Sequence, residues 1–308
     1  MKRITRDHTV SPQVRHKVRT PVAEVELGET FVVETINFRT PIIRSAEDAN
    51  PKSYREREET GPIFVEGIQA GDVLAIKILD IRPEGHASGG SADASGKGSF
   101  LEIRDDKVHF PGNLSHPLKM MIGDIRVQPA KEVANPWDYG GNMDFKDISV
   151  GNTLLLKAEL PGGLLVLGDI HAAQGDGEME GVAAECAGEV TLQITKETTW
   201  PVERPTVRKA NSFVSIACRS GVDGYWLARD QAVEDATKIL AKLKGCTEGE
   251  ARLYVRTVGD LRNGAVWAMG RSEPSWCIHL PLVVGVEVPV ENQSANTASH
   301  DTLANSRP

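Results

Sequence analysis

Short apolar runs, each preceded by a glycine and a polar residue, recur through the first half of the chain. They begin at Gly28, Gly71 and Gly151, where the sequence reads GETFVV, GDVLAI and GNTLLL. Glycine followed by a polar residue is typical of a turn, and a short run of branched apolar residues is typical of a strand. Residues 71–81 also alternate between two faces, as a half-buried strand does. The pattern predicts duplicated β structure, arranged as a sandwich or barrel.

Helical periodicity appears in the last third of the chain. Apolar side chains between residues 230 and 243 recur on one helical face, and Gly245 is expected to end this helix as its C-cap. Thr247 and Glu250 form a capping box, which predicts a second helix as far as Val258. Two helices therefore follow the β structure.

These patterns divide the chain into three predicted segments. Residues 1–200 form a β-rich domain that carries the candidate chemistry, residues 201–290 form an α+β domain that ends in a strand at 278–290, and residues 291–308 form a polar, disordered tail. Residues 84–99 (EGHASGGSADASGKGS) are expected to be a flexible exposed loop. The predicted fold class is mostly β with an α+β C-terminal part: a duplicated β-sandwich or barrel-like core plus two C-terminal helices.

Composition and charge exclude several classes of partner. The chain has 308 residues, 25% of them charged, with a net charge of −8 and a pI near 5.6. Nucleic-acid-binding surfaces are usually basic, and no basic cluster is present, so we expect no nucleic-acid partner.

The first residues (MKRITRDHTV) lack the apolar core of a signal peptide, and no segment approaches the ~20 apolar residues of a membrane span. Four widely spaced cysteines without a CxxC pair favour a reducing compartment, and we expect a cytoplasmic protein.

One stretch near the middle of the chain, LLVLGDIHAAQGDGEMEGVAAE, gathers the candidate catalytic residues. Leu164–Leu167 is expected to be a buried strand that ends at Gly168. Residues two apart in an extended chain share a face, so Asp169 and His171 are expected to project side by side. A carboxylate and an imidazole on one face can bind a transition metal or act as an acid–base pair.

Two further groups of polar residues are expected beside this pair. Gly175-Asp176-Gly177 forms a turn that brings Glu178 back toward the imidazole. In DYGGNMD, Asn142 and Asp144 again have same-face spacing, and the preceding glycine pair allows a close backbone approach. Together these residues predict a single assembled site. The alternative is that both stretches are ordinary polar turns with solvated charges.

The longer motifs resemble the acetamidase/formamidase family. They are GPIFVEGIQAGDVLAIKILDI, NPWDYGGNMDFKDISVGNTLLL, LGDIHAAQGDGEMEGVAAE and, in the C-terminal third, RDQAVEDATKILAKLKGCTEGEARLYVRTVGDLRNG. The resemblance covers nearly the whole chain. It implies a β-rich fold with an α+β C-terminal part and the hydrolysis of short aliphatic amides to a carboxylate and ammonia. It also implies a divalent metal, usually zinc, and self-association into a homodimer or larger homo-oligomer.

Two stretches depart from the family pattern. Where the family has an HPFxGxxG-like segment, this chain has Leu118 and Met120 in place of the phenylalanine and a glycine. Asn37 stands where an early block of the family has an acidic residue. These changes bear on the choice of substrate more than on the reaction.

Amide hydrolysis requires an activated water, a group that stabilises the oxyanion and a proton carrier. We expect Asp144, Asp169 and His171 to hold the metal, with Asp169 and His171 also counted among the catalytic residues. Glu178 is expected to act as the general base. Zinc is the expected ion, and calcium is a second candidate. Glu185 is expected to hold His171 in one tautomer.

The remaining candidates concern the substrate and other mechanisms. Five residues are predicted to contact a small amide substrate: Asn142, Gln174, His116, Glu34 and Glu66. No GxSxG motif is present, and Cys186 is a candidate nucleophile, although isolated cysteines are more often inert core residues. Two alternative functions stay open. One is a γ-lactam or carbamoyl C–N hydrolase, and the other is a non-catalytic metabolite-binding β protein on the same scaffold.

Overall fold

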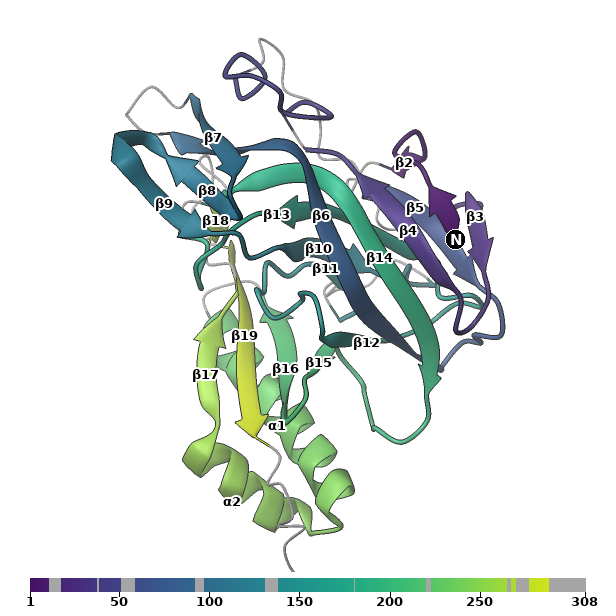
Figure 1. Ribbon diagram of the computed structural model, residues 1–308. Helices are drawn as coiled ribbons and strands as arrows, with labels where there is room; N and C mark the ends of the chain where they lie inside the picture. The colour runs from purple at the N-terminus through teal and green to yellow at the C-terminus, as the bar shows by residue number, and fades with distance from the viewer. Residues whose placement is uncertain are drawn as a thin grey trace, which may run out of the picture.

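Two β layers make up the larger part of the molecule (Figure 1). The computed structural model describes residues 1–10, 18–37, 39–50, 59–91, 97–130, 138–179, 181–219, 223–264, 267–269 and 277–287. The predicted tail at 291–308 therefore lies outside the described residues, as does the end of the strand expected at 278–290.

The first layer is built on two long curved strands, β6 (Val73–Ser91) and β14 (Glu185–Glu197). They pair antiparallel along the whole length of β14, and Figure 1 shows them crossing in front of β10, β11 and β13. On one side β14 pairs with β4 (Thr30–Thr35), which pairs in parallel with β1 (Lys2–Ile4). On the other side β6 pairs with β12 (Thr153–Lys157).

The second layer is centred on β13 (Leu165–His171). It pairs antiparallel with β5 (Glu59–Val65) and with β10 (Met121–Arg126). The short strands that extend this layer are β2 (Thr9–Val10), β3 (Ala23–Val25) and β11 (Gly140–Asn142). The two layers join where β13 ends and β14 begins, since His171 lies opposite Glu185 in the strand register.

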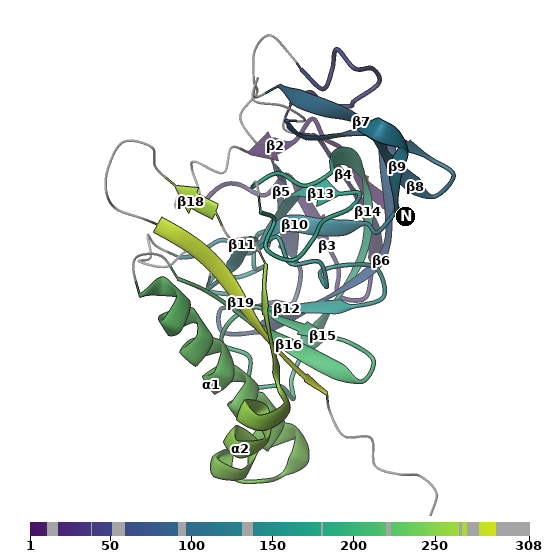
Figure 2. The same cartoon turned by 90° about the vertical axis from the view of Figure 1, so that its left-hand side faces the viewer.

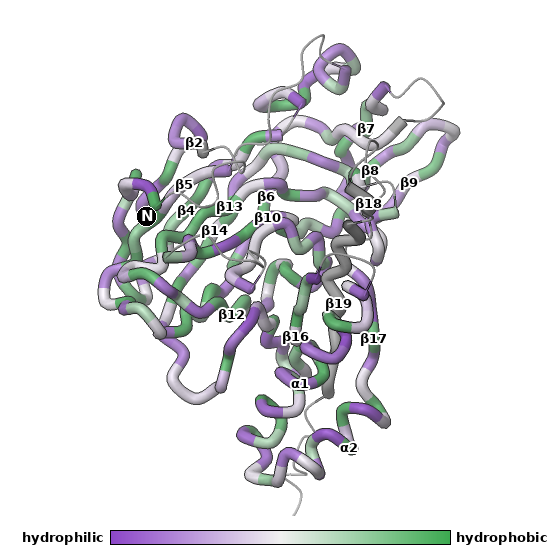
Figure 3. Tube along the Cα trace, turned by 180° about the vertical axis from the view of Figure 1, so that it is seen from behind, coloured by the Kyte–Doolittle hydropathy of each residue, from purple (hydrophilic) through white to green (hydrophobic). Residues whose placement is uncertain are grey.

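The main hydrophobic core lies between the two layers. It contains fully buried side chains from the first layer, such as Phe31 and Ile76, and from the second, such as Ile122 and Leu167. Hydrophobic stretches are visible along β12 and β16 in Figure 3. The predicted turns before three strands are confirmed by positive φ angles of 82°, 91° and 88° at Gly28, Gly71 and Gly151.

A β-hairpin extension leaves the first layer at the end of β6. Its elements are β7 (Gly98–Arg104), β8 (Lys107–Phe110), the short 3₁₀ turn η2 (Pro111–Asn113) and β9 (Leu114–Pro117). The prediction of an exposed loop at 84–99 is wrong for residues 84–91, which continue β6, and for residues 98–99, which begin β7. Glycine is required at position 85 because a Cβ there would lie 2.3 Å from the carbonyl oxygen of Ile43.

The C-terminal part places two helices beside a smaller group of strands (Figure 2). The strands are β15 (Thr206–Arg208), β16 (Ser212–Arg219), β17 (Asp260–Asn263), β18 (Trp267–Met269) and β19 (Cys277–Glu287). Helix α1 (Gly224–Lys244) packs its small apolar residues, including Ala232 and Ala236, against Phe213 of β16. This part continues the first layer, because β15 pairs with β12.

Both helix ends follow the local signals in the sequence. Helix α1 ends at Gly245, whose φ of 63° is the left-handed conformation that glycine adopts readily. Helix α2 (Glu248–Val258) begins with the predicted capping box between Thr247 and Glu250. The predicted fold class, mostly β with an α+β C-terminal part and two helices, is confirmed. Neither helix in the described residues is long and apolar enough to cross a membrane.

Candidate active site

The predicted site lies at the junction of the two β layers, at the end of β13. The strand does not end at Gly168 as predicted, because pairing with β10 continues as far as His171. Asp169 has a φ of 53°, so the chain is not extended there and the two-residue spacing does not explain the geometry. The side chains meet nevertheless, with Oδ2 of Asp169 at 3.6 Å from Nε2 of His171.

The His171 imidazole is fully buried and its two nitrogens have different surroundings. Nδ1 lies 2.7 Å from Oε1 of Gln174, whose amide nitrogen donates in turn to the backbone oxygen of Asp144. That second bond fixes the orientation of the Gln174 amide, so Nδ1–H is the donor to Oε1. Nε2 faces the carboxylates, with Oε2 of Glu185 at 3.0 Å and Asp169 beyond it.

Four buried carboxylates converge on this imidazole. Donor atoms of Asp144, His171 and Glu178 lie within 4.8 Å of one another, and so do those of Asp169, His171 and Glu185. The five residues predicted as metal ligands, general base or support for His171 are therefore brought together from two separate stretches of the chain, at residue 144 and at residues 169–185. The prediction of a single assembled site, rather than two solvated turns, agrees with this geometry.

The protonation of His171 reflects these neighbours. Burial alone lowers the pKa of an imidazole, but the charges of Glu185 and Asp169 outweigh burial and raise the pKa of His171 well above its usual value. In the neutral tautomer, Nε2 carries a lone pair that would face two carboxylates, which is unfavourable unless a proton or a cation lies between them. One imidazole nitrogen and several carboxylate oxygens are a donor set that suits a divalent transition metal, so the residues fit the predicted ion.

Three carboxylate residues of the site have strained backbone conformations. Asp144, Asp169 and Glu178 have φ angles of 46°, 53° and 36°, in the left-handed region that residues with a Cβ rarely adopt. Such a conformation costs on the order of 1–3 kcal/mol at each residue and persists only where the surrounding structure imposes it. Directing these three side chains into the site therefore lowers the stability of the folded state.

Asn142 and Gly123 shape the surroundings of Asp144. Nδ2 of Asn142 donates to Oδ2 of Asp144 at 2.6 Å, so this residue, predicted to contact the substrate, holds a carboxylate of the site. Gly123 leaves the space that the cluster occupies: a Cβ there would lie 2.7 Å from Oδ1 of Asp144 and 2.8 Å from Cε1 of His171. Sequence reasoning missed Gly123, although a glycine inside the apolar strand MIGDIR signals a close approach.

A cavity of about 510 Å³ adjoins the cluster on the side of Gln174. Its lining combines apolar and charged side chains: Ile81, Leu118, Lys119, Met120, Lys146, Asp147, Ser149, Val150 and Gln174. Leu118 and Met120 are the two residues that depart from the pattern of the resembling family. Their position beside Gln174 agrees with the prediction that they influence the choice of substrate.

Residues 6–113 and 118–211 match the Acetamidase/Formamidase family. The chain belongs to this family. It is 33% identical over 248 residues to the formamidase of Methylophilus methylotrophus, an alignment that covers 56% of this chain and 60% of that protein. The chain spans about 60% of the length of the curated relatives that it matches.

Solved structures from the acetamidase/formamidase family share the whole architecture. The acetamidase from Bacillus halodurans is 29% identical, with a TM-score of 0.79 over 92% of this chain and 97% of that one. A protein of Thermoanaerobacter tengcongensis described as a predicted acetamidase/formamidase is 27% identical, with a TM-score of 0.79 over 93% and 95% of the two chains. The resemblance read from the sequence motifs is confirmed.

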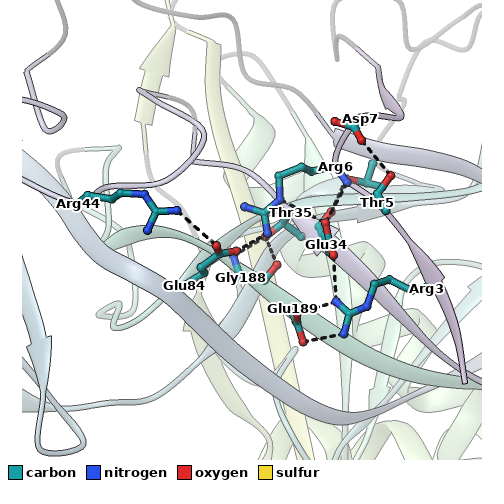
Figure 4. Close-up of polar contacts among 11 residues, drawn as sticks. Arg3, Thr5, Arg6, Asp7, Glu34, Thr35, Arg44, Glu84, Gly188 and Glu189 are labelled. Atoms are coloured by element: carbon teal, nitrogen blue, oxygen red, sulfur yellow. Dashed lines mark hydrogen bonds and ion pairs between the residues drawn. The ribbon is translucent and has the colours of Figure 1, made fainter.

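Three of the predicted substrate residues lie elsewhere on this family member. His116 and Glu66 are exposed, and Nδ1 of His116 contacts the backbone oxygen of Pro117. Glu34 is engaged by Arg3 at 2.9 Å and by Arg6 at 3.4 Å (Figure 4). Burial raises the pKa of Glu34, but the hydrogen bonds from these arginines outweigh burial and lower it. The geometry brings none of the three to the carboxylate cluster.

Gln174 and Glu185 contact different nitrogens of His171. Gln174 makes the contact with Nδ1 that fixes the tautomer of His171, a role predicted for Glu185. Glu185 instead reaches Nε2, on the side where the carboxylates gather. Asn37 is the second departure from the family pattern. Its Nδ2 donates to the backbone oxygen of Glu185 at 2.8 Å and so helps to hold that residue in place. Asn37 is buried, and its side-chain amide contacts the backbone of Glu185.

Proposed function

We propose that this chain hydrolyses a short-chain aliphatic amide, similar to formamide or acetamide, to a carboxylate and ammonia with the help of a divalent metal. Membership of the acetamidase/formamidase family supports the reaction. The main support for a bound metal is the orientation of the His171 imidazole. Its Nδ1 is bound by Gln174, while its Nε2 faces Glu185 and Asp169. Buried like charges repel, and a divalent cation among the carboxylates relieves that repulsion.

The roles follow from the positions around Nε2. Asp144, Asp169 and His171 are the ligands predicted from the sequence, and the structure groups Asp144 with His171 and Glu178, and Asp169 with His171 and Glu185. Glu185 is therefore a further oxygen donor, close to Nε2 of His171. A divalent metal held by these residues would supply Lewis-acid chemistry, polarising the amide carbonyl and making a water more acidic. Glu178 then accepts the proton of the attacking water and delivers it to the departing nitrogen. Zinc, a homo-oligomeric state and a cytoplasmic location are further predictions from the sequence.

The substrate is expected to enter through the cavity beside Gln174. Leu118 and Met120 offer apolar contact to the acyl group there, while the amide carbon approaches the carboxylate cluster. Gln174 lines this cavity and contacts His171, so it connects the cavity with the imidazole of the site.

Ammonia release from purified protein tests the proposal. We expect turnover of formamide or acetamide, loss of turnover after exhaustive treatment with a chelator, and recovery on adding Zn²⁺. The measurement is ammonia formed per chain, with the metal content determined on the same samples. Full activity in metal-free protein would exclude the metal, and a metal-loaded protein that releases ammonia from no amide would exclude the reaction.

Cys186 is expected to take no covalent part in the reaction. Its thiol is fully buried, it lies 3.5 Å from the backbone oxygen of Ile170, and burial raises its pKa far above the usual value of a cysteine. The substitution Cys186→Ala should therefore keep kcat/KM within about threefold of the wild type, because a protonated thiol is a poor nucleophile. An inactive but folded variant that binds metal normally would revive the nucleophile hypothesis.

A further inference from the structure

An arginine from the C-terminal part of the chain contacts both loops that carry site carboxylates. Arg262 lies in β17, opposite Val283 of β19 in the strand register. Its Nε and Nη2 donate to the two oxygens of Asp176 at 3.1 and 3.2 Å, and its Nη1 donates to Asp147 at 3.0 Å. The planar guanidinium group presents donors in a fixed fork, so one arginine can bind two carboxylates at defined positions.

The two acceptors are close in sequence to strained residues of the site. Asp147 follows Asp144 by three residues, and Asp176 precedes Glu178 by two. Both Asp144 and Glu178 are held at positive φ, which requires support from their surroundings. Arg262 contacts the loops that carry both residues at once, and its guanidinium carbon also lies 4.9 Å from the centre of the Phe145 ring.

Further contacts hold the loops of Asp147 and Asp176 in place. The backbone N–H of Gly177 donates to the backbone oxygen of Gly264 at 2.6 Å, two residues beyond Arg262. Lys146 lies 3.2 Å from Asp176, and Lys209 donates to Asp147 at 3.0 Å. Burial raises the pKa of Asp176, but hydrogen bonds from Arg262 and Lys146 outweigh burial and lower it. Asp176 is thus an ionised partner in this network, and the prediction of an ordinary turn residue omits this contact.

We propose that Arg262 is a positioning residue for the reaction: by joining Asp147 to Asp176 it sets the separation between Asp144 and Glu178. The C-terminal α+β part therefore completes a site whose ionisable groups all come from residues 144–185. The inference rests on the proposed function, because it assigns Glu178 and Asp144 to the hydrolysis. A shift of about 1 Å in a catalytic group can reduce a rate ~100-fold even when the altered residue does not touch the substrate.

The substitution Arg262→Met tests this role. We expect kcat for amide hydrolysis to fall about 30- to 100-fold while KM changes less than about threefold, since Leu118 and Met120, the proposed acyl contacts of the pocket, are not partners of Arg262. Arg262→Lys should recover part of kcat, because a lysine can reach one carboxylate but lacks the fork. Asp176→Asn should reproduce the loss, and the double variant Arg262→Met with Asp176→Asn should be little worse than either single variant.

A second arginine–aspartate pair offers a matched control. Nε and Nη2 of Arg204 donate to the two oxygens of Asp235 at 2.6 and 2.7 Å, in a contact between the chain before β15 and helix α1. This pair is more buried than that of Arg262, so Arg204→Met should lower the melting temperature at least as much. It should nevertheless leave kcat within about threefold of the wild type, because it supports neither loop of the site.

Backbone hydrogen exchange separates this inference from the proposed function. In Arg262→Met, amides of residues 175–179 should exchange at least ~10-fold faster, while Arg204→Met should leave them unchanged. If the wild type hydrolyses no amide, the proposed function fails, yet faster exchange would still support the positioning role of Arg262. Unchanged exchange together with unchanged kcat in Arg262→Met would overturn the inference.

Discussion

Replacing Asp169 with asparagine is expected to remove nearly all amide hydrolysis while the fold stays intact. The carboxylate of Asp169 lies 3.6 Å from Nε2 of His171, on the side where we place the metal. The substitution removes one negative charge from the donor set but keeps the size of the side chain. Asparagine also tolerates the left-handed backbone that Asp169 adopts at a φ of 53°, so no new strain is introduced. We expect kcat/KM to fall by about 10³-fold, comparable to the loss of a group that stabilises the transition state directly.

Three measurements are needed on this variant. Ammonia release gives the activity, atomic emission gives metal bound per chain, and calorimetry gives the melting temperature. Asp105→Asn is the matched control, because Asp105 also has a positive φ, 50°, but is exposed in the turn between β7 and β8. The control should retain full activity. An Asp169→Asn variant with normal activity and normal metal content would contradict both assignments of Asp169.

Local signals explain which parts of the structure could be predicted from the sequence. Gly28, Gly71 and Gly151 identify turns because glycine alone adopts their positive φ at little cost. Gly245 and the Thr247–Glu250 capping box identify helix ends because the stabilising hydrogen bonds are made within a few residues. In each case the residues that determine the feature are neighbours in the sequence.

Features that depend on long-range pairing are harder to predict. Residues 84–91 look like a flexible loop by composition, but pairing with β14 and contacts with Ile43 make them part of a strand. The arrangement of the candidate active site also depends on long-range strand pairing. Residue type identifies the ionisable residues near His171, whereas the contact of Glu185 with Nε2 rather than Nδ1 depends on the strand register opposite His171. No local pattern in the sequence predicts which residues pair in that register.

Arg262 shows most clearly what the sequence alone cannot predict. It lies 84 residues beyond Glu178 in the sequence and reaches the site only because β17 pairs with β19 and β19 with β16. No motif of the sequence connects it with the polar clusters at residues 142–144 and 169–178. A positioning residue of this kind becomes visible only when the three-dimensional structure shows which carboxylates its guanidinium contacts.

Gly123→Ala is expected to disrupt the site by a single added methyl group. The new Cβ would lie 2.7 Å from Oδ1 of Asp144 and 2.8 Å from both the backbone oxygen of Asp169 and Cε1 of His171. Contacts this short cannot persist, and the carboxylate and imidazole must move because β10 is held between β13 and β11. We expect kcat/KM to fall at least ~100-fold and metal affinity to fall with it. Overpacking should also cost about 1–3 kcal/mol of stability.

A control glycine separates displacement of the site from a general effect on strand stability. A Cβ added to Gly90, in β6, would meet no atom within 4 Å, so Gly90→Ala should leave both activity and metal affinity close to wild type. Enzyme assays, metal titration and thermal unfolding of the two variants give the comparison. If Gly123→Ala unfolded at the wild-type temperature and kept wild-type kcat/KM, the close approach of Asp144 and His171 over Gly123 would not be required for the reaction. If it lost stability alone, Gly123 would serve packing, and the positions of the Asp144 carboxylate and the His171 imidazole would tolerate the shift that the methyl group imposes.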